Sequence, residues 1–262
     1  MLFRSTAIEL KKRGYRVIAS ARKPEDVQRL IDEGFATVLL DLADSHSVQR
    51  GFEQAVELAD GRLDALFNNG AFGQPGAVED VTREVLLNQF ETNVFGTHEL
   101  TNLCIALMRK QGYGRIIYNS SVLGFVALSY RGAYNASKYA LEGLADTLRL
   151  ELHDTNIKIV LIEPGPILSN FRNNSFALYK KNINKKISAH ADAYQAMEDR
   201  LQTEGPAVPF TLPATAVVDK VIKALESQQP YIRYYVTFPT YLFGYLKRIL
   251  PMRWMDALLR RV

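Results

Sequence analysis

The sequence predicts a single α/β domain in which helices cover both faces of a doubly wound parallel sheet, giving three layers. Short apolar segments alternate with amphipathic segments along residues 3–162, as strands and helices alternate in such sheets. The chain has 262 residues, of which 47% are hydrophobic, and this suffices for one sizeable core. It contains no internal repeat and no low-complexity linker, so we treat residues 1–262 as one domain.

The individual elements follow from apolar runs and from the residues that begin and end helices. A first helix over residues 3–13 is predicted to end at Gly14, because glycine tolerates the backbone conformation that closes a helix. The predicted strands are residues 15–20, 37–41, 63–67, 115–118 and 158–162. The other predicted helices run from Pro24 to Gly34, from Asp44 or Ser45 to Leu58, and over residues 83–110 and 132–153.

Beyond Gly165 the alternation weakens. Residues 170–212 are polar and irregular, and a helix is expected only near 188–203. Insertions beyond the carboxyl end of a strand are where lids over substrates lie in open α/β sheets, so we interpret this segment as a substrate lid. Residues 238–262 are amphipathic, and Pro251 should divide them into two short helices.

Composition excludes several classes of protein. The formal net charge of +4 is spread along the chain, whereas a nucleic-acid partner would require a concentrated basic stripe. The four histidines lie far apart without the spacing of metal ligands, so no metal site is expected. One cysteine, Cys104, and no apolar run of about 18 residues indicate a cytoplasmic protein without a membrane span.

The segment Tyr134-Asn-Ala-Ser-Lys138 carries the main chemical signal. Residues four apart on a helix share a face, so this tyrosine and lysine should lie side by side. An ammonium beside a phenol favours the phenolate and lowers a pKa that is otherwise about 10. Tyr134 could then give a proton to an alkoxide forming on a substrate, or accept one in the reverse reaction. The alternative is a chance pair on an ordinary helix.

Two further positions strengthen this hypothesis. Ser120 and Ser121 follow the strand 115–118 at its carboxyl end, where such folds hold their sites. We expect Ser121 to bind the substrate oxygen beside the tyrosine, and one of the two serines to have only a turn or capping role. Asn93 lies inside the helix 83–110, where asparagine is a mediocre residue and is either solvated or functional.

In this order and spacing, Asn93-Val-Phe-Gly96, Ser121 and Tyr134-x-x-x-Lys138 resemble the catalytic set of the short-chain dehydrogenase/reductase family. Asn69-Gly-Ala71 and Pro164-Gly165 resemble two further motifs of that family. The resemblance covers residues 5–238 and is nearest to a branch of bacterial NADP-dependent aldehyde reductases. It implies a Rossmann-like fold and hydride transfer between a nicotinamide cofactor and a carbonyl or alcohol.

The resemblance also implies a role for each matching residue. Tyr134 would be the general acid and base, and Lys138 would lower its pKa and hold the nicotinamide ribose. Ser121 would orient the substrate carbonyl, and Asn93 would fix a water that links Lys138 to solvent. The other implied cofactor contacts are Asp41 and Leu42 at the adenine, Asn69 in the cofactor cleft, and Pro164, Ile167 and Ser169 over the nicotinamide and its amide.

The end of the strand 15–20 predicts NADP(H) as the cofactor. An acidic residue there would bind the ribose 2′-hydroxyl and repel a 2′-phosphate, but the sequence reads Ser20-Ala-Arg22-Lys23. Arg22 can hold a phosphate with its planar fork of donors, and Lys23 adds positive charge. The alternative is that both are solvated charges ahead of the helix at Pro24.

Two features depart from the family pattern. Its Asn-Asn-Ala-Gly motif reads Asn68-Asn-Gly-Ala71, an exchange of two small residues that keeps the loop compact. The first strand and the glycine-rich loop that binds the pyrophosphate have no counterpart before the helix 3–13. Because that strand is central in the sheet, we expect the chain to be an N-terminally truncated reading of a longer protein.

Together these observations predict an NADPH-dependent oxidoreductase that reduces an aldehyde or ketone to an alcohol by reversible hydride transfer. The alternative is a non-catalytic scaffold that has lost cofactor binding with its glycine-rich loop, although the complete catalytic set argues against it. Aromatic residues within 170–245 favour an apolar small-molecule substrate. Family members assemble through helices equivalent to 83–110 and 132–153, which implies a homo-oligomer. The sequence does not identify the substrate or the physiological direction.

The segment 238–262 leaves a further alternative open. It combines many aromatic and aliphatic residues with five cations, Lys247, Arg248, Arg253, Arg260 and Arg261, against one acid, Asp256. Aromatic residues beside a basic polar side are typical of a helix that lies on a membrane surface. The simpler interpretation is a helix that closes the substrate pocket or packs on a partner subunit.

Overall fold

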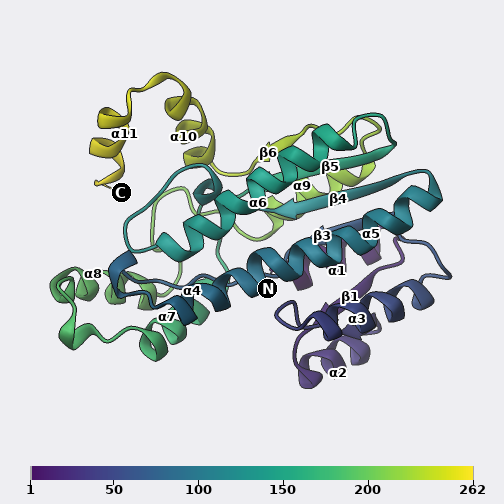
Figure 1. Cartoon of the computed structure of the whole chain (residues 1–262), viewed down its shortest axis with the longest axis horizontal. Helices are drawn as coiled ribbons and strands as arrows, with labels where there is room; N and C mark the ends of the chain where they lie inside the picture. The colour runs from purple at the N-terminus through teal and green to yellow at the C-terminus, as the bar shows by residue number, and fades with distance from the viewer. Residues whose placement is uncertain (1, 262) are drawn as a thin grey trace.

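The parallel strands of the computed structural model, which describes residues 2–261, form two sheets and not one (Figure 1). Residues 1 and 262, the outer ends of the predicted domain and C-terminal segment, lie outside the described residues. The first sheet pairs β1 with β2, and the second has the order β3-β4-β5-β6. The strands are β1 (Ile18–Ala21), β2 (Ala36–Leu39), β3 (Ala65–Asn68), β4 (Gly114–Asn119), β5 (Ile157–Glu163) and β6 (Arg233–Tyr235).

The division of the sheet lies between β1 and β3. These are the two strands that would flank the strand predicted to be absent, so the described strands confirm a parallel α/β fold with a gap at that place. The two sheets are nevertheless joined through side chains. Val38 of β2 and Leu40, which follows β2, pack with Leu100 and Leu103 of a helix that also covers the second sheet.

Helices alternate with the strands as predicted up to β5. Within the described residues the α-helices are α1 (Leu2–Lys12), α2 (Pro24–Asp32), α3 (Ser45–Leu58), α4 (Arg83–Phe90), α5 (Thr97–Gln111), α6 (Gly132–Glu151), α7 (Phe171–Asn182), α8 (Ala191–Gln202), α9 (Thr215–Glu226), α10 (Phe238–Ile249) and α11 (Met252–Leu259). Helix α1 is followed by Gly14 at φ +85°, the left-handed conformation expected where glycine ends a helix.

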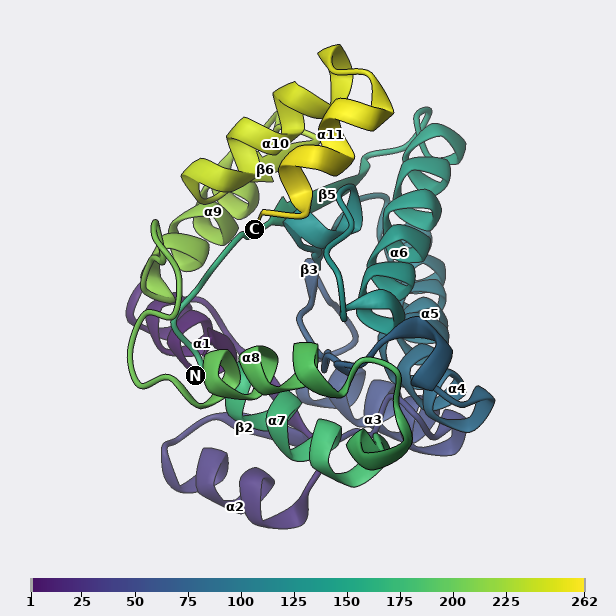
Figure 2. The same cartoon turned by 90° about the vertical axis from the view of Figure 1, so that its left-hand side faces the viewer.

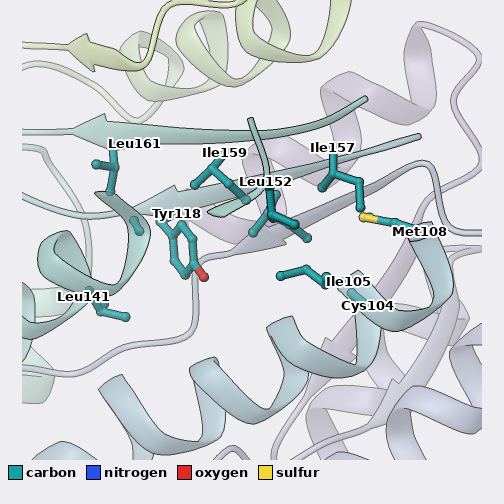
Figure 3. Close-up of a cluster of buried hydrophobic side chains, with 11 residues drawn as sticks. Cys104, Ile105, Met108, Tyr118, Leu141, Leu152, Ile157, Ile159 and Leu161 are labelled. Carbon is teal, nitrogen blue, oxygen red and sulfur yellow. The ribbon is translucent and has the colours of Figure 1, made fainter. Parts of the chain in front are cut away.

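The second sheet is covered on both faces, and this fixes the site at the ends of its strands. On one face, side chains of α5 and α6 pack against β4 and β5, including Met108, Tyr118 and Leu161, as Figure 3 shows. On the other face, Val217 and Val221 of α9 pack against Ile117 of β4. The predicted three-layer arrangement is therefore present around β4 and β5.

The predicted helix 83–110 is present, but its middle turn is π-helical. A π-helical turn, Glu91–Gly96, separates α4 from α5. At its end the backbone of Leu42 comes so close that a Cβ on Gly96 would lie 1.7 Å from the Leu42 carbonyl oxygen. Only glycine permits this approach, which brings the segment after β2 against the start of α5. Such π turns often occur at functional sites.

The segment predicted as an irregular lid contains more structure than expected. Helix α7 was not predicted, and α8 corresponds to the helix expected near 188–203. Tyr179 of α7 and Tyr194 of α8 are buried together with Ala77 from the loop after β3. This second small core holds α7 and α8 over the carboxyl end of the sheet. Helix α9 and strand β6, which follow the lid, were also not predicted.

In Figure 1 the C-terminal helices lie above α7 and α8 at the left-hand end of the molecule, and Figure 2 looks onto that end. The predicted interruption at Pro251 is present, between α10 and α11. Phe243 and Met255 attach the two helices to Val126 in a separate apolar cluster. Within residues 2–261, every helix is too short or too polar to cross a membrane.

Candidate active site

Three of the four predicted catalytic residues meet where β4 and β5 end. Tyr134 and Lys138 lie on the first two turns of α6, and Ser121 follows β4. The carboxyl ends of β4 and β5 are adjacent because these strands are parallel and paired in register, Asn119 with Ile162. The predicted proximity of tyrosine and lysine is observed, with the Lys138 Nζ atom 5.6 Å from the centre of the Tyr134 ring.

The side chain of Tyr134 is partly buried, with its ring against an apolar neighbour and its hydroxyl beside Ser121. Its ring lies 5.3 Å from the ring of Phe171, the first residue of α7, so the segment predicted as a lid reaches Tyr134. Burial raises the pKa of Tyr134, while a hydrogen bond with the Ser121 side chain acts in the opposite direction. We predicted that Lys138 would lower the pKa of Tyr134, but in the structure this pKa is raised. The loss of solvent around the phenol outweighs the opposing hydrogen bond with Ser121. Tyr134 is therefore a protonated phenol at neutral pH in this structure.

Lys138 is almost completely buried, with 2% of its surface exposed. Its Nζ donates a hydrogen bond to the backbone oxygen of Asn119 at 2.7 Å. Burial lowers the pKa of Lys138 to about 8, against an opposing effect of the Glu142 carboxylate one turn further along α6. An ammonium has three donors, and the hydrogen bond to the Asn119 backbone oxygen occupies one of them. Lys138 can thus donate to a further oxygen near Tyr134.

The two serines have different surroundings. Ser121 begins the short helical turn Val122–Gly124, where its Oγ accepts a hydrogen bond from the Leu123 amide at 3.1 Å. It also interacts with the Tyr134 side chain. Ser120 is directed away from the tyrosine and donates to the carboxylate of Glu142. The structure thus places Ser121, and not Ser120, next to the hydroxyl of Tyr134.

Asn93 is completely buried within the π-helical turn. Its Nδ2 donates to the Phe72 carbonyl at 2.9 Å and to Ser137 Oγ at 3.1 Å, and its Oδ1 accepts from the Phe72 amide. Ser137 in turn donates to the Tyr134 carbonyl at 2.8 Å. Asn93 therefore ties the loop after β3 to the helix that carries Tyr134. The predicted water-mediated link to Lys138 stays a prediction.

A buried charged cluster behind Lys138 escaped the sequence analysis. Arg233, the first residue of β6, donates to Glu142 and to Glu163, and to Asp146 at 2.6 Å. Glu163 is fully buried, and its Oε2 has no hydrogen-bond partner among the described residues. Burial and the nearby Glu142 raise the pKa of Glu163, although Arg233 opposes this. Arg233 stands 70 residues or more from these acids in the sequence, so no local pattern reveals the cluster.

The residues predicted at the adenosine end come from the first sheet. Arg22 follows β1 and is exposed, and Lys23, also exposed, lies 3.7 Å from Glu25. Asp41 follows β2 and accepts a hydrogen bond from the Ala43 amide. Leu42 lies against the loop after β3, where a Cβ on Gly70 would come within 2.7 Å of its side chain.

The residues predicted near the nicotinamide lie closer to Tyr134. Asn69 accepts a hydrogen bond from Asn119 Nδ2 at 2.8 Å. The Pro164 carbonyl is 3.5 Å from Ser121 Oγ. Ile167 pairs with Leu212 in an isolated parallel bridge, and Ser169 Oγ accepts from the Phe171 amide. The predicted cofactor residues thus follow the strand ends from β1 to β5.

Two observations fit a nicotinamide nucleotide bound along the strand ends from β1 to β5. The Oδ1 of Asn119 is buried without a partner among the described residues, and Lys138 has donors to spare beside it. At the other end, Arg22 is exposed with no carboxylate in contact within residues 2–261. In that part of the chain no glycine-rich turn leads into α1, so we assign no residue to the pyrophosphate. The described residues also contain no cluster of three acidic, histidine or cysteine side chains suited to a metal.

Comparison with known proteins agrees with this geometry. Residues 3–180 match the family model described as short chain dehydrogenase. The chain is 42% identical over 255 residues to the uncharacterized oxidoreductase YbbO of Escherichia coli (strain K12), covering 97% of this chain and 88% of that protein. It is 29% identical to the NADPH-dependent 3-dehydrocapnine reductase of Ornithobacterium rhinotracheale, covering 94% and 88% of the two chains. A short-chain dehydrogenase structure from Streptomyces avermitilis superposes with a TM-score of 0.78 and 25% identity, covering 95% and 89%.

Proposed function

The chain belongs to the short-chain dehydrogenase family and is an oxidoreductase, and from this premise we propose that it reduces an aldehyde or ketone to an alcohol with NADPH. The single observation that carries the proposal is the arrangement of Tyr134 and Ser121. A partly buried phenol with a raised pKa lies beside a serine hydroxyl at the end of β4. We place this activity in the cytoplasm, as the cysteine content indicates.

The protonation state of Tyr134 suits reduction. Hydride addition to a carbonyl creates an alkoxide, and an alkoxide needs a proton donor within hydrogen-bond reach. Tyr134 is held as the neutral phenol, so it can donate that proton. Ser121 Oγ can orient the carbonyl oxygen toward Tyr134, and Lys138 stabilises the phenolate that remains.

The bound cofactor would supply the hydride, while the protein positions and polarises the substrate. Lys138 and Asn119 would hold the nicotinamide ribose, and Pro164 would form the floor beside Ser121. We propose NADP(H) because Arg22 and Lys23 follow β1 where an acidic residue would select NAD(H). The relative from Ornithobacterium rhinotracheale, named as NADPH-dependent, supports this choice.

The substrate is proposed to be apolar apart from its carbonyl. Phe171, which contacts the Tyr134 ring, is 36% exposed, and the nearby Leu168 is 43% exposed. Leu168 belongs to the segment that joins β5 to the lid, and Phe171 is the first residue of α7 in the lid itself. Apolar groups beside a small number of polar ones are typical of sites for small organic ligands.

A non-catalytic scaffold is not favoured. Lys138 is buried with a lowered pKa, and burial of an ionisable group is unfavourable unless a function or partner compensates for it. Glu142, Ser120 and Arg233 form an ordered polar layer behind it. A scaffold would gain stability from apolar residues at these positions.

The test is NADPH consumption with a panel of aldehydes and ketones that range from polar to apolar. Tyr134→Phe should lose turnover by at least about 10²-fold, since it removes the proton donor. Tyr139→Phe is the matched control, because Tyr139 is the next tyrosine on α6 and is 40% exposed. Retention of more than about a tenth of the activity in Tyr134→Phe would contradict the assignment.

A further inference from the structure

Helix α10 has two apolar faces, and only one of them is covered. Phe243 and Thr240 face the body of the protein, with Phe243 in the cluster around Val126. The outer face carries exposed apolar residues at positions 238, 241, 242, 245 and 249, the spacing that places side chains on one side of a helix. We call these five residues the outer stripe: Phe238, Tyr241, Leu242, Tyr245 and Ile249.

The outer stripe continues along the chain into α11. Ile249 is 73% exposed, and beyond the turn at Pro251, Met252 and Trp254 are 71% and 67% exposed. Both views show these helices at the edge of the molecule (Figures 1 and 2). Large apolar side chains scattered singly are ordinary on a protein surface. The outer stripe is different, because its apolar residues recur with the helical period and its three aromatic rings are joined by that of Trp254, and such a patch marks an interaction surface.

The charges around the outer stripe select the partner. In the described part of this segment Arg248, Arg253, Arg260 and Arg261 stand against the single acid Asp256. The fifth cation, Lys247, is turned toward the body of the protein, where its Nζ donates to the Phe125 carbonyl. Aromatic side chains with one apolar and one polar end, bordered by cations, match the interface of a bilayer with anionic headgroups. A second copy of the chain fits less well, because a symmetric contact would bring the same cations together.

We therefore propose that α10 and α11 dock this protein on the surface of an anionic phospholipid membrane. The helices would lie in the plane of the headgroups with the outer stripe and Trp254 inserted. Arg253, near the start of α11, and Arg260 and Arg261, just after it, would contact lipid phosphates. The attachment is peripheral and salt-sensitive, since part of it is electrostatic.

The outer stripe also leads toward the candidate active site. Phe238 begins α10, and its ring lies 4.8 Å from the ring of Phe210, which is 59% exposed. Two residues later, Leu212 pairs with Ile167 in the segment that precedes Phe171. Phe171 contacts Tyr134. On the basis of the proposed function, this chain of apolar contacts would admit a long-chain carbonyl compound from the lipid.

Trp254 provides a direct probe, because it is the only tryptophan in the sequence. With vesicles of phosphatidylcholine and phosphatidylglycerol at low salt, its fluorescence should shift to shorter wavelength and resist quenching by iodide. Tyr245→Ser combined with Ile249→Ser should weaken vesicle binding at least about tenfold, since each removes a large inserted apolar group. The signal should fall with added salt and on vesicles of phosphatidylcholine alone.

The matched control combines Tyr231→Ser with Ile187→Ser, which removes a tyrosine and an isoleucine of similar exposure, 77% and 83%, outside α10 and α11. This variant should bind vesicles like the unaltered protein. An unchanged Trp254 spectrum on anionic vesicles at low salt would overturn the proposal. Equal loss of binding in the control would also overturn it, as would light scattering that shows a dimer broken by the outer-stripe variant.

A second experiment tests delivery of substrate from the lipid separately from the reductase activity. A long-chain aldehyde carried in anionic vesicles should be reduced at least about tenfold more slowly by the outer-stripe variant, while a short water-soluble aldehyde should be reduced at the normal rate. Equal rates on both substrates would overturn the lipid delivery but leave the proposed reaction intact. No reduction of either substrate by the unaltered protein would contradict the proposed function, and the Trp254 measurement would still decide the docking.

Discussion

The catalytic side of the molecule and the side predicted to bind the adenosine end of the cofactor differ in how firmly their polar groups are held. Around α6, Asn93, Ser121 and Lys138 are buried and each has a protein partner. Around β1, Arg22 and Lys23 are exposed. The difference teaches that proton transfer depends on groups fixed in advance, whereas recognition of a phosphate can depend on flexible surface cations.

The largest expected effect concerns the layer that supports the catalytic side. Arg233→Met leaves Glu142, Glu163 and Asp146 without their shared cation. Breaking a buried ion pair costs about 3–5 kcal/mol, and we expect about 3 because a quarter of the Arg233 side chain is exposed. Urea unfolding measures this loss. Arg13→Met, which breaks an exposed pair with Glu226, should leave the free energy of unfolding nearly unchanged, and a loss equal to that of Arg233→Met would refute the distinction.

Substitution of each of the two serines tests which of them lies beside the Tyr134 hydroxyl. Ser121→Ala should reduce kcat/KM by about 10²-fold, because it removes a donor directed at the reacting oxygen. Ser120→Ala should lose less activity per folded molecule, since Ser120 contacts Glu142 and not Tyr134. Steady-state kinetics with thermal unfolding of both variants gives the comparison. The reverse order would mean that the wrong serine has been assigned.

The cofactor side is tested by changing Arg22 to Asp together with Lys23 to Ala. The variant should lower the ratio of kcat/KM with NADPH to that with NADH by at least about tenfold, because charge-assisted hydrogen bonds to the 2′-phosphate are lost. Lys12→Ala with Arg29→Asp changes similar surface charges elsewhere and is the control. A ratio that stays constant in the first variant would show that these cations are ordinary solvated charges.

The smallest expected effect is a pH dependence. Burial lowers the pKa of Lys138 to about 8. Lys138 is therefore mainly a charged ammonium below that pH, and it loses its proton as the pH rises through it. Tyr134 keeps its proton over the same range because its pKa is raised. The value of kcat/KM for reduction should therefore decline above about pH 8, and a profile flat to pH 10 would exclude Lys138 as the titrating group.

Local patterns predicted the elements and motifs that depend on nearby residues. The strands of the second sheet up to β5, the pair Tyr134 and Lys138, and the interruption at Pro251 all follow from spacing within one element. Helix α7 was missed because its apolar residues, such as Tyr179, are buried against Tyr194 and Ala77 from distant segments. The polar surroundings in the sequence hide that tertiary contact.

The electrostatics of the site could not be read from the sequence. Spacing predicts that Lys138 lies near Tyr134, but the pKa of Tyr134 depends on how much solvent the surrounding elements exclude. The charged cluster shows the same limit, since Arg233 reaches Glu163 only because β6 pairs with β5. The π-helical turn at Asn93 depends on the approach of Leu42 to Gly96, and these residues are 54 positions apart.

The central claim is that proton transfer and recognition of the 2′-phosphate reside on separate parts of this molecule. Its most direct test is to titrate NADPH and to measure turnover at saturating NADPH for Tyr134→Phe and for the Arg22 and Lys23 variant. We predict that Tyr134→Phe keeps an NADPH Kd within about tenfold of normal while turnover falls by at least about 10²-fold. The Arg22 and Lys23 variant should show weakened NADPH binding with nearly normal turnover. If both variants changed the same quantity, the account would be contradicted.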